Sequence, residues 1–404
     1  MTHSFSVGGG GAGGGGGAGA MNRAHSSAVA GRSLVKSKEK VGAVEARELT
    51  AGKEGGGVAT ARALAAPEVQ DMTRRVSTHC GRPLFFLTRT PSINCLTCNV
   101  DLGMNLFLRI IRRREDGYHE LASLFQTVAF GDTLLLKVLP AIAVQDEFSS
   151  SYTSLVTDQS NLVLRALDLF REKTGKTQRF EVYLEKRTPV QAGLGGGSSN
   201  AATTLFAANQ LLGTPATDEE LIEWSKELGS DITFFLSKGT AYCTGRGELL
   251  EPVPPLPSSI KLYVVKPPVG LSTPAVFKAL DLDALNGEDP RDLLAAFTQH
   301  LSRGELGPAS MYINDLEPPA FQCVPRLKAI KEALLARGFD CVMMSGSGTA
   351  IFAMAPAPSS LPSSAGLSFD AAAFAREMEV DIWATTFTNR PSDDPKAWYP
   401  NPHA

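Results

Sequence analysis

Cysteine is scarce in this sequence, and its spacing predicts neither a disulfide framework nor a zinc site. Only 6 of the 404 residues are cysteine, which is few for a chain of this length to depend on disulfides. Cys95 and Cys98 form a lone Cys-x-x-Cys, whereas a structural zinc site needs four ligands. We therefore expect reduced cysteines, a reducing compartment and no metal site built from side chains.

Long apolar runs and a strong net charge are also missing. No apolar stretch is long enough to span a bilayer, and the net charge is -3. Residues 1–82 contain 11 Lys and Arg against 6 Asp and Glu, and the remainder contains 28 against 36. An acidic body does not hold nucleic acid by broad electrostatics. We expect neither a membrane nor a nucleic acid as partner, and any bound phosphate must be held locally.

The first 84 residues lack the composition of a folded domain. Residues 7–20 are almost entirely glycine and alanine, and no acidic residue precedes Glu39. Basic residues, serine and alanine are common there, and the apolar core of a secretory signal is missing. This pattern predicts a disordered organelle transit peptide over residues 1–84. The alternative is a disordered tail without a targeting role.

From about residue 85 onward, helical and strand patterns alternate, which predicts a mixed α/β chain. The proline-rich segment Glu251–Ser259 indicates a boundary, so we predict domains at residues 85–254 and 255–390 and a tail at 391–404. The periodicity predicts helices at 160–175, 217–229 and 324–338, strands at 179–186 and 260–267, and a strand–loop–strand unit at 341–355. We expect Ser160 or Asn161 to cap the first helix and Gly175 to end it, and Thr217 with Glu220 to form a capping box in the second.

A glycine-rich loop, "PVQAGLGGGSS", carries the clearest functional signal. It follows a predicted strand and opens a predicted helix. Without Cβ atoms, backbone N–H groups can converge on an anion, and the helix N-terminus adds a positive dipole end. The spacing fits neither a Walker loop nor a dinucleotide fold. We predict a polyphosphate cradle, with a tight turn as the alternative, formed by Pro189, Gly193, Leu194, Gly195, Gly196, Gly197, Ser198 and Ser199.

Several motifs together resemble the GHMP kinases. They run from about Asn105 to Phe352 and read "NLFLRI", "REDGYHELASLFQTV", the glycine loop, "GSDITFFLSKGTAYCTGRGE", "NDLE" and "SGSGTAIFA". The resemblance implies a β-rich N-terminal domain and a ferredoxin-like C-terminal domain. It also implies ATP and Mg²⁺ as cofactors, a cytidyl diphosphate polyol as small-molecule substrate, a plastid location, and a monomer or weak homodimer.

Asp231 is the candidate catalytic residue. It follows a glycine at the end of a predicted helix and precedes an apolar run. Its position alone is compatible with a structural partner at the helix end or with a base. The resemblance implies that Asp231 takes the proton from the attacking hydroxyl, since phosphoryl transfer needs positioning, charge neutralisation and a base.

The first motif departs from the family pattern. The family has a lysine two residues before Asn105, where this chain has Gly103. Either residues 88–104 are wrongly assembled, or the enzyme has lost a catalytic cation. Because the other motifs are intact, we favour wrong assembly. The second alternative keeps a catalytically silent nucleotide-binding protein in consideration.

The remaining site residues concern the two substrates. Tyr118 can stack on a base and His119 can hydrogen-bond its edge, although a surface turn would look the same. The resemblance places the cytosine there, which argues against GHMP kinases with smaller acceptors. It further implies acceptor contacts at Asn105, Thr273 and Phe277, and adenine contacts at Asn161 and Lys186, where a helix cap and an ordinary surface lysine are the alternatives.

Overall fold

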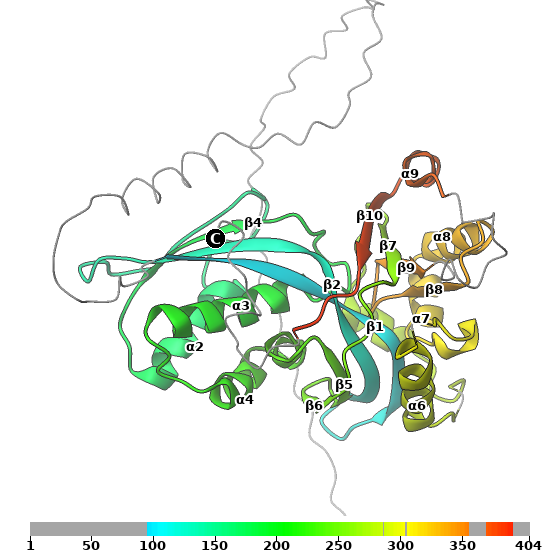
Figure 1. Cartoon of the computed structure of the whole chain (residues 1–404), viewed down its shortest axis with the longest axis horizontal. Helices are drawn as coiled ribbons and strands as arrows, with labels where there is room; N and C mark the ends of the chain where they lie inside the picture. Colours follow the sequence, from blue (N-terminus) through cyan, green and yellow to red (C-terminus); the bar gives the residue numbers. More distant parts are fainter. Residues whose placement is uncertain (1–94, 286, 304, 355–368, 391–404) are drawn as a thin grey trace, which may run out of the picture. The chain divides into compact units, whose positions relative to one another are not determined.

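Two long antiparallel strands form the framework of the fold (Figure 1). The computed structural model describes residues 95–285, 287–303, 305–354 and 369–390. Strand β1 (Cys95–Arg113) pairs with β2 (His119–Val138) from Cys95 opposite Lys137 to Arg113 opposite His119. Most residues of β1 between Cys98 and Ile110 are buried, because the strand has a helical layer on one side and the second sheet on the other.

The first sheet has the order β3-β4-β2-β5-β6, with β1 paired to β2. Its pairs are antiparallel except for β3 with β4. In Figure 1, α2, α3 and α4 lie along one side of the long strands. The elements are β3 (Glu147–Ser150), β4 (Phe180–Glu185), β5 (Thr240–Gly245), β6 (Leu249–Pro252), α2 (Leu162–Thr174), α3 (Gly196–Leu211) and α4 (Asp218–Leu228).

The predicted capping residues are confirmed in both amphipathic helices. Asn161 accepts a hydrogen bond from the N–H of Val163 at the start of α2, and Gly175 ends this helix with φ of 68°. Thr217 and Glu220 form the capping box of α4. These caps satisfy N–H groups that a helix leaves without intrahelical partners.

The second sheet has the order β10-β7-β9-β8, and all its pairs are antiparallel. In chain order this is 4-1-3-2, the order of a ferredoxin-like sheet, as predicted. The strands are β7 (Lys261–Lys266), β8 (Cys341–Met344), β9 (Ile351–Met354) and β10 (Asp381–Thr386). The helices are α5 (Thr273–Ala279), α6 (Pro290–Leu301), α7 (Glu317–Cys323), α8 (Pro325–Leu335) and α9 (Ala371–Met378), and the short 3₁₀ turns are η1 (Ser230–Leu236) and η2 (Ala309–Met311).

The two sheets share an apolar core and are not separated by a clean boundary. Side chains of β1 and β2, such as Phe107 and Leu124, pack in one cluster with Phe297 and Phe352. The segment after β10 then returns to the first sheet, where the Nε2 of Gln126 donates to the carbonyl of Thr388 at 2.7 Å. The predicted boundary near residue 255 therefore lies between the two sheets along the chain, but the two sheets pack against each other through a shared core.

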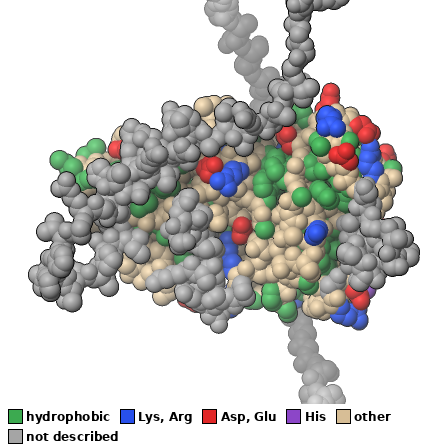
Figure 2. All heavy atoms as spheres, turned by 45° about the horizontal axis from the view of Figure 1, so that its top comes forward, with side chains coloured by type: hydrophobic (Ala, Val, Ile, Leu, Met, Phe, Trp, Pro, Cys, Tyr) green, Lys and Arg blue, Asp and Glu red, His purple; other side chains and the backbone are tan. Residues whose placement is uncertain are grey.

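Charges on the described surface are mixed in sign. On the face shown in Figure 2, basic side chains adjoin acidic ones at several places. Ion pairs such as Arg337 with Glu377 and Arg326 with Glu379 connect neighbouring surface groups. Pairs of this kind contribute little to stability, typically about 0–1 kcal/mol.

The predicted transit peptide and C-terminal tail lie outside the described residues. The same holds for the predicted beginning of the folded body at residues 85–94. Within the described part, no helix combines the length and apolar composition that a membrane span requires.

Candidate active site

A large pocket lies where the first glycine loop, the β1–β2 turn, η1 and the start of α5 meet. Its volume is about 1410 Å³, which exceeds the range of about 300–1,000 Å³ for pockets that hold one drug-sized ligand. The pocket is therefore large enough for two ligands side by side. The predicted site residues that line it are Asn105, Tyr118, His119, Gly193, Gly195, Ser198, Asp231, Thr273 and Phe277.

The remaining predicted site residues lie in or near the site without lining the pocket. They are Pro189, Leu194, Gly196, Gly197, Ser199, Asn161 and Lys186. Ser199 donates its hydroxyl to the carbonyl of Asp101 at 2.6 Å, which fixes the start of α3 to β1. This serine therefore has a structural partner, whereas Ser198 faces the pocket.

The glycines of the first loop are required by its backbone and by close packing. Gly193 and Gly195 have φ of +73° and +66°, values that disfavour other residues. A Cβ on Gly193 would lie 2.4 Å from the carbonyl oxygen of Ser345, and one on Gly195 would lie 2.6 Å from the ring of Phe235. A Cβ on Gly196 would point toward Lys186. The direction in which a side chain would point from each of these glycines is occupied by protein. Gly193 and Gly195 therefore line the pocket with their backbone.

This backbone offers unused hydrogen-bond donors. Within the described residues, the N–H groups from Gly193 to Ser198 have no hydrogen-bond partner. Three of them open α3, where helix geometry leaves N–H groups unpaired and the dipole end is positive. The loop therefore offers unpaired donors and the positive end of a helix dipole, which suit an anion.

Lys186 and Asn161 both have structural partners. The Nζ of Lys186 donates to Asp132 at 2.6 Å and to the hydroxyl of Thr188, and the side chain is 5% exposed. This places a buried cation beneath Gly196 of the glycine loop. Asn161 caps α2. Their contacts with adenine stay a prediction.

Asp231 is the only carboxylate among the residues that line the pocket. Gly229 ends α4, and the buried side chains from Ile232 to Leu236 anchor η1, which holds Asp231 at its first turn. The surrounding protein raises the pKa of Asp231 by desolvation, although the side chain stays accessible from the pocket. No ion pair to Asp231 exists within the described chain. An unpaired carboxylate with a raised pKa is suited to accept a proton.

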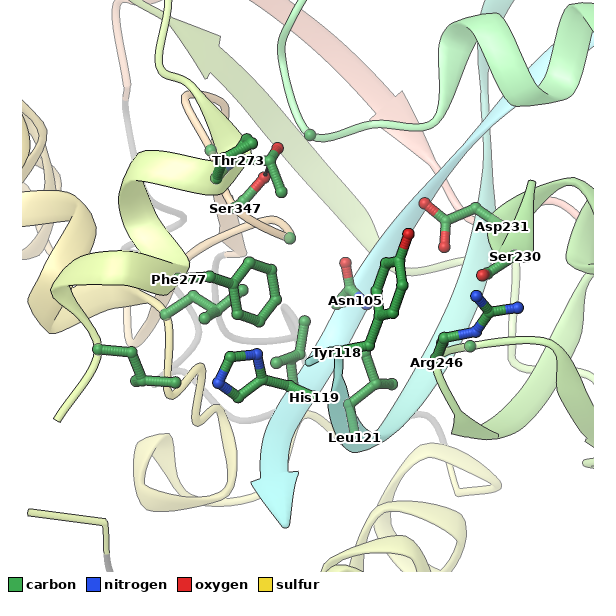
Figure 3. A pocket seen from close by; sticks show the side chains of 18 of the residues that line it. Asn105, Tyr118, His119, Leu121, Ser230, Asp231, Arg246, Thr273, Phe277 and Ser347 are labelled. Carbon is green, nitrogen blue, oxygen red and sulfur yellow. Dashed lines mark hydrogen bonds between the residues drawn. The ribbon is translucent and has the colours of Figure 1, made fainter. Parts of the chain in front are cut away.

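Aromatic rings also line the pocket. In Figure 3 the rings of Tyr118 and Phe277 flank the pocket from two sides, with His119 beside Phe277. The rings of His119 and Phe277 stack with centroids 4.9 Å apart, and Tyr118 is 59% exposed. Desolvation and the nearby Arg113 lower the pKa of His119, so its imidazole is neutral at pH 7. A neutral ring can both donate and accept a hydrogen bond.

Gly103 faces protein and not the pocket. Residues 95–104 form the first half of β1, and a Cβ on Gly103 would lie 3.0 Å from ring atoms of both Phe234 and Phe235. A longer side chain at this position would need those rings to shift. The cations that do line the pocket are Arg113, Arg246 and Lys278.

Sequence reasoning missed the roles of Arg246 and Ser347. The guanidinium of Arg246 lies 5.1 Å from the centroid of the Tyr118 ring, at the Asp231 side of the pocket (Figure 3). The hydroxyls of Ser347 and Thr273 are 2.7 Å apart. Arg246 lies in "GRGE" and Ser347 in "SGSG", and both stretches belong to the motifs that resemble the GHMP kinases. Those motifs are the sequence signal that could have pointed to the two residues.

Comparisons with known proteins agree with this fold. Residues 161–239 match the GHMP kinases N terminal domain, and residues 293–364 match the GHMP kinases C terminal family. These two matches give the class of protein, because they identify both domains of a GHMP kinase in the chain.

Relatives at higher identity narrow the class further. The chain is 51% identical over 249 residues to 4-diphosphocytidyl-2-C-methyl-D-erythritol kinase of Protochlamydia amoebophila (strain UWE25), covering 62% of this chain and 81% of that protein. It is 45% identical over 268 residues to the chloroplastic/chromoplastic enzyme of that name from Solanum lycopersicum, covering 65% of each, slightly less than two thirds of the plant protein. A crystal structure of 4-(cytidine 5'-diphospho)-2C-methyl-D-erythritol kinase matches with a TM-score of 0.59 at 32% identity, covering 72% of this chain and 99% of that one. The chain belongs to the family of 4-diphosphocytidyl-2-C-methyl-D-erythritol kinases.

We predict that Asp231→Asn lowers kcat by about 10²–10⁴-fold, because the general base is lost, while ATP still binds. The pKa of Asp231 is raised in the folded state, so the ionised carboxylate reduces folding stability at pH 7, and asparagine removes that cost. Stopped assays and thermal unfolding at pH 7 should show lost turnover with an undiminished Tm. Full turnover in the variant would rule out Asp231 as the base.

A second prediction concerns the close approach of the loops. Gly193→Ala would place a methyl group 2.4 Å from the carbonyl oxygen of Ser345, whereas Gly197→Ala meets only Leu162 at 3.6 Å. We expect the first variant to lose stability and ATP affinity, and the second to retain both. Urea unfolding measures the stability of both variants, and calorimetric titration with ATP measures their affinity. Equal behaviour of the two variants would contradict the packing argument.

Proposed function

We propose that this chain transfers the γ-phosphate of ATP to the 2-hydroxyl of 4-diphosphocytidyl-2-C-methyl-D-erythritol. One observation carries this proposal: a carboxylate, a loop of unpaired N–H groups and an aromatic end meet in a single pocket. Each feature serves one part of the reaction, namely the base, the phosphate donor and the cytidyl acceptor.

The base step follows from the position of Asp231. The carboxylate accepts the proton of the 2-hydroxyl while that oxygen forms a bond to the γ-phosphorus. The bond from the γ-phosphorus to the bridging oxygen breaks, and ADP leaves with the electron pair. Because Asp231 has no ion pair within the described residues, its charge is free to act on the acceptor.

The glycine loop is the phosphate site in this proposal. The unpaired N–H groups from Gly193 to Ser198 can bind phosphate oxygens, and the buried ion pair of Lys186 with Asp132 supports the loop from beneath. Magnesium usually takes one or two protein ligands together with substrate phosphates. The hydroxyl of Ser198, which lines the pocket, would fit that role, and the ion would neutralise phosphate charge when bound.

The cytidyl end is proposed to lie among the aromatic rings. A cytosine ring can stack on Tyr118 or Phe277, and the neutral imidazole of His119 can hydrogen-bond its edge. Arg113, Arg246 and Lys278 line the same pocket and match an acceptor that carries a diphosphate. A small uncharged acceptor would leave these groups unused.

A second candidate function is favoured by one observation. Gly103 stands where the family has a lysine, and its side-chain direction is occupied by Phe234 and Phe235. The second candidate function is therefore that of a nucleotide-binding protein of low turnover, which requires that no other cation acts in place of the lysine. The smaller-acceptor GHMP kinases have no comparable support from the pocket.

The plastid stroma is the proposed location. The basic, glycine-rich segment before residue 85 is typical of a transit peptide, and the plant relative is named chloroplastic/chromoplastic. Residues 1–84 can be fused to a fluorescent protein, and import of the fusion into isolated plastids would test this assignment.

The proposed reaction can be tested by an acceptor panel combined with Tyr118→Ala. We expect ADP release with the cytidyl diphosphate acceptor and not with homoserine or mevalonate. Loss of the stacking ring should raise the KM for the acceptor by about 5–150-fold, the equivalent of 1–3 kcal/mol, without changing the KM for ATP. Tyr152→Ala is the matched control, since Tyr152 is an exposed tyrosine that does not line the pocket. Turnover of a smaller acceptor, or equal effects of both variants, would contradict the assignment.

The missing lysine gives a separate prediction. Phe235→Leu relieves the contact with one of the two rings, and Phe234 must also shift before a side chain at position 103 can reach the pocket. In this background, Gly103→Lys should turn over at least about a hundredfold faster than Gly103→Met. The two side chains are similar in length and differ in charge, so packing effects cancel. Equal rates would show that another group, such as Arg246, already supplies the charge.

A further inference from the structure

The loop between β8 and β9 brings a second set of backbone donors to the pocket. Gly346, Ser347 and Gly348 all line it. Within the described residues, the N–H groups of Gly346 and Ser347 have no hydrogen-bond partner. Like the first glycine loop, this loop therefore offers unpaired backbone N–H groups to an anion.

Asn314 lies directly behind this loop. Its side chain is 3% exposed and does not line the pocket. The Nδ2 donates to the carbonyls of Met344 and Gly346, both at 2.8 Å, and the Oδ1 accepts from the N–H of Leu316 at 2.9 Å. One buried amide thus holds two carbonyl groups of the loop.

The residues next to Asn314 are fixed to β1. Asp315 accepts from the N–H of Ile110 at 2.7 Å and from the Nε of Arg109 at 3.0 Å. Glu317 accepts from the N–H of Met344 at 2.8 Å. Because β1 also carries Asn105, the loop is held in a defined position relative to the strand that lines the pocket.

A further contact joins the front of the loop to the first glycine loop. The hydroxyl of Ser345 donates to the carbonyl of Gly193 at 3.0 Å and accepts from the N–H of Asn105 at 3.4 Å. Ser345 therefore joins the two glycine loops, and Asn314 holds the second of them.

The geometry points to Asn314 as a positioning residue that turns the N–H of Ser347 toward a phosphate group in the pocket. In a trans peptide the C=O of one residue and the N–H of the next point in opposite directions. The carbonyl of Gly346 points back to Asn314, so the N–H of Ser347 points away from Asn314, toward the pocket side. This inference rests on the proposed function, since both ATP and the cytidyl acceptor carry phosphates.

Replacing Asn314 by aspartate should reverse this orientation. A carboxylate oxygen in place of the Nδ2 would face the two carbonyl oxygens, and the repulsion would favour a turned peptide that exposes an oxygen to the phosphate. Asn209 provides the matched control. It is also buried, and its side chain bonds the carbonyl and N–H of Ala216 at 2.9 and 3.0 Å, but it lies in α3 and does not line the pocket.

The experiment measures ligand affinity by calorimetry for the full chain, Asn314→Asp and Asn209→Asp, at a temperature where all are folded. The ligands are ATP and the cytidyl diphosphate acceptor, with adenosine and cytidine as phosphate-free counterparts. We expect Asn314→Asp to raise the Kd of at least one phosphate ligand about tenfold and to leave the phosphate-free ligands unchanged. The ligand affected identifies which phosphate the loop holds. Asn209→Asp should change none of these values.

Equal affinities in the two variants would overturn the inference, as would an equal loss for adenosine and cytidine, which would show a general structural effect. If Asn314→Asp does not fold, Asn314→Ala decides, because it removes both hydrogen bonds to the loop carbonyls without adding a charge. It should also raise the Kd of a phosphate ligand, and an unchanged Kd would overturn the inference. A wild-type chain that binds neither phosphate ligand would contradict the proposed function itself, which separates the two failures.

Discussion

The close approach of two backbone segments determines the geometry of the site. The first glycine loop and the loop between β8 and β9 come so near that a single Cβ on Gly193 would lie 2.4 Å from the carbonyl oxygen of Ser345. The contact is stabilised by the hydroxyl of Ser345 and by the N–H of Ala350, which donates to the carbonyl of Ala192 at 2.9 Å. Because no side chains stand between the two loops, backbone N–H groups from both can reach one pocket. A hydrogen bond that such a group forms there is stronger than in water, because the surroundings are less polar.

The site combines functional groups that reduce stability with a rigid support. Asp231 is desolvated without an ion pair in the described chain, and the first loop leaves a series of N–H groups without partners. Groups in such a partly enclosed pocket lose part of their hydration without gaining a protein partner, which costs free energy. They persist because η1 is anchored by buried aromatic side chains and α3 is almost completely buried. Binding of a phosphate and of an acceptor hydroxyl would satisfy the same groups.

Much of the fold could be predicted from local sequence signals. Asn161, Gly175 and the Thr217–Glu220 box fixed the ends of two helices, because caps act within a few residues. The motif resemblance placed nine predicted residues around one pocket, although their individual roles stay predictions. What could not be predicted depends on distant contacts: Lys186 turns to Asp132 beneath the loop, the glycine side-chain directions meet protein and not ligand, and Asn314 reaches a loop 30 positions further along the chain.

The most direct test of the account is the position of the transferred phosphate. The full chain would be incubated with ATP, Mg²⁺ and the cytidyl diphosphate acceptor, and the product examined by proton-coupled ³¹P NMR. The account predicts a new phosphate ester on the tertiary 2-oxygen, whose phosphorus has no three-bond coupling to a carbon-bound proton. A coupled multiplet from another hydroxyl, or ADP without a phosphorylated acceptor, would contradict it.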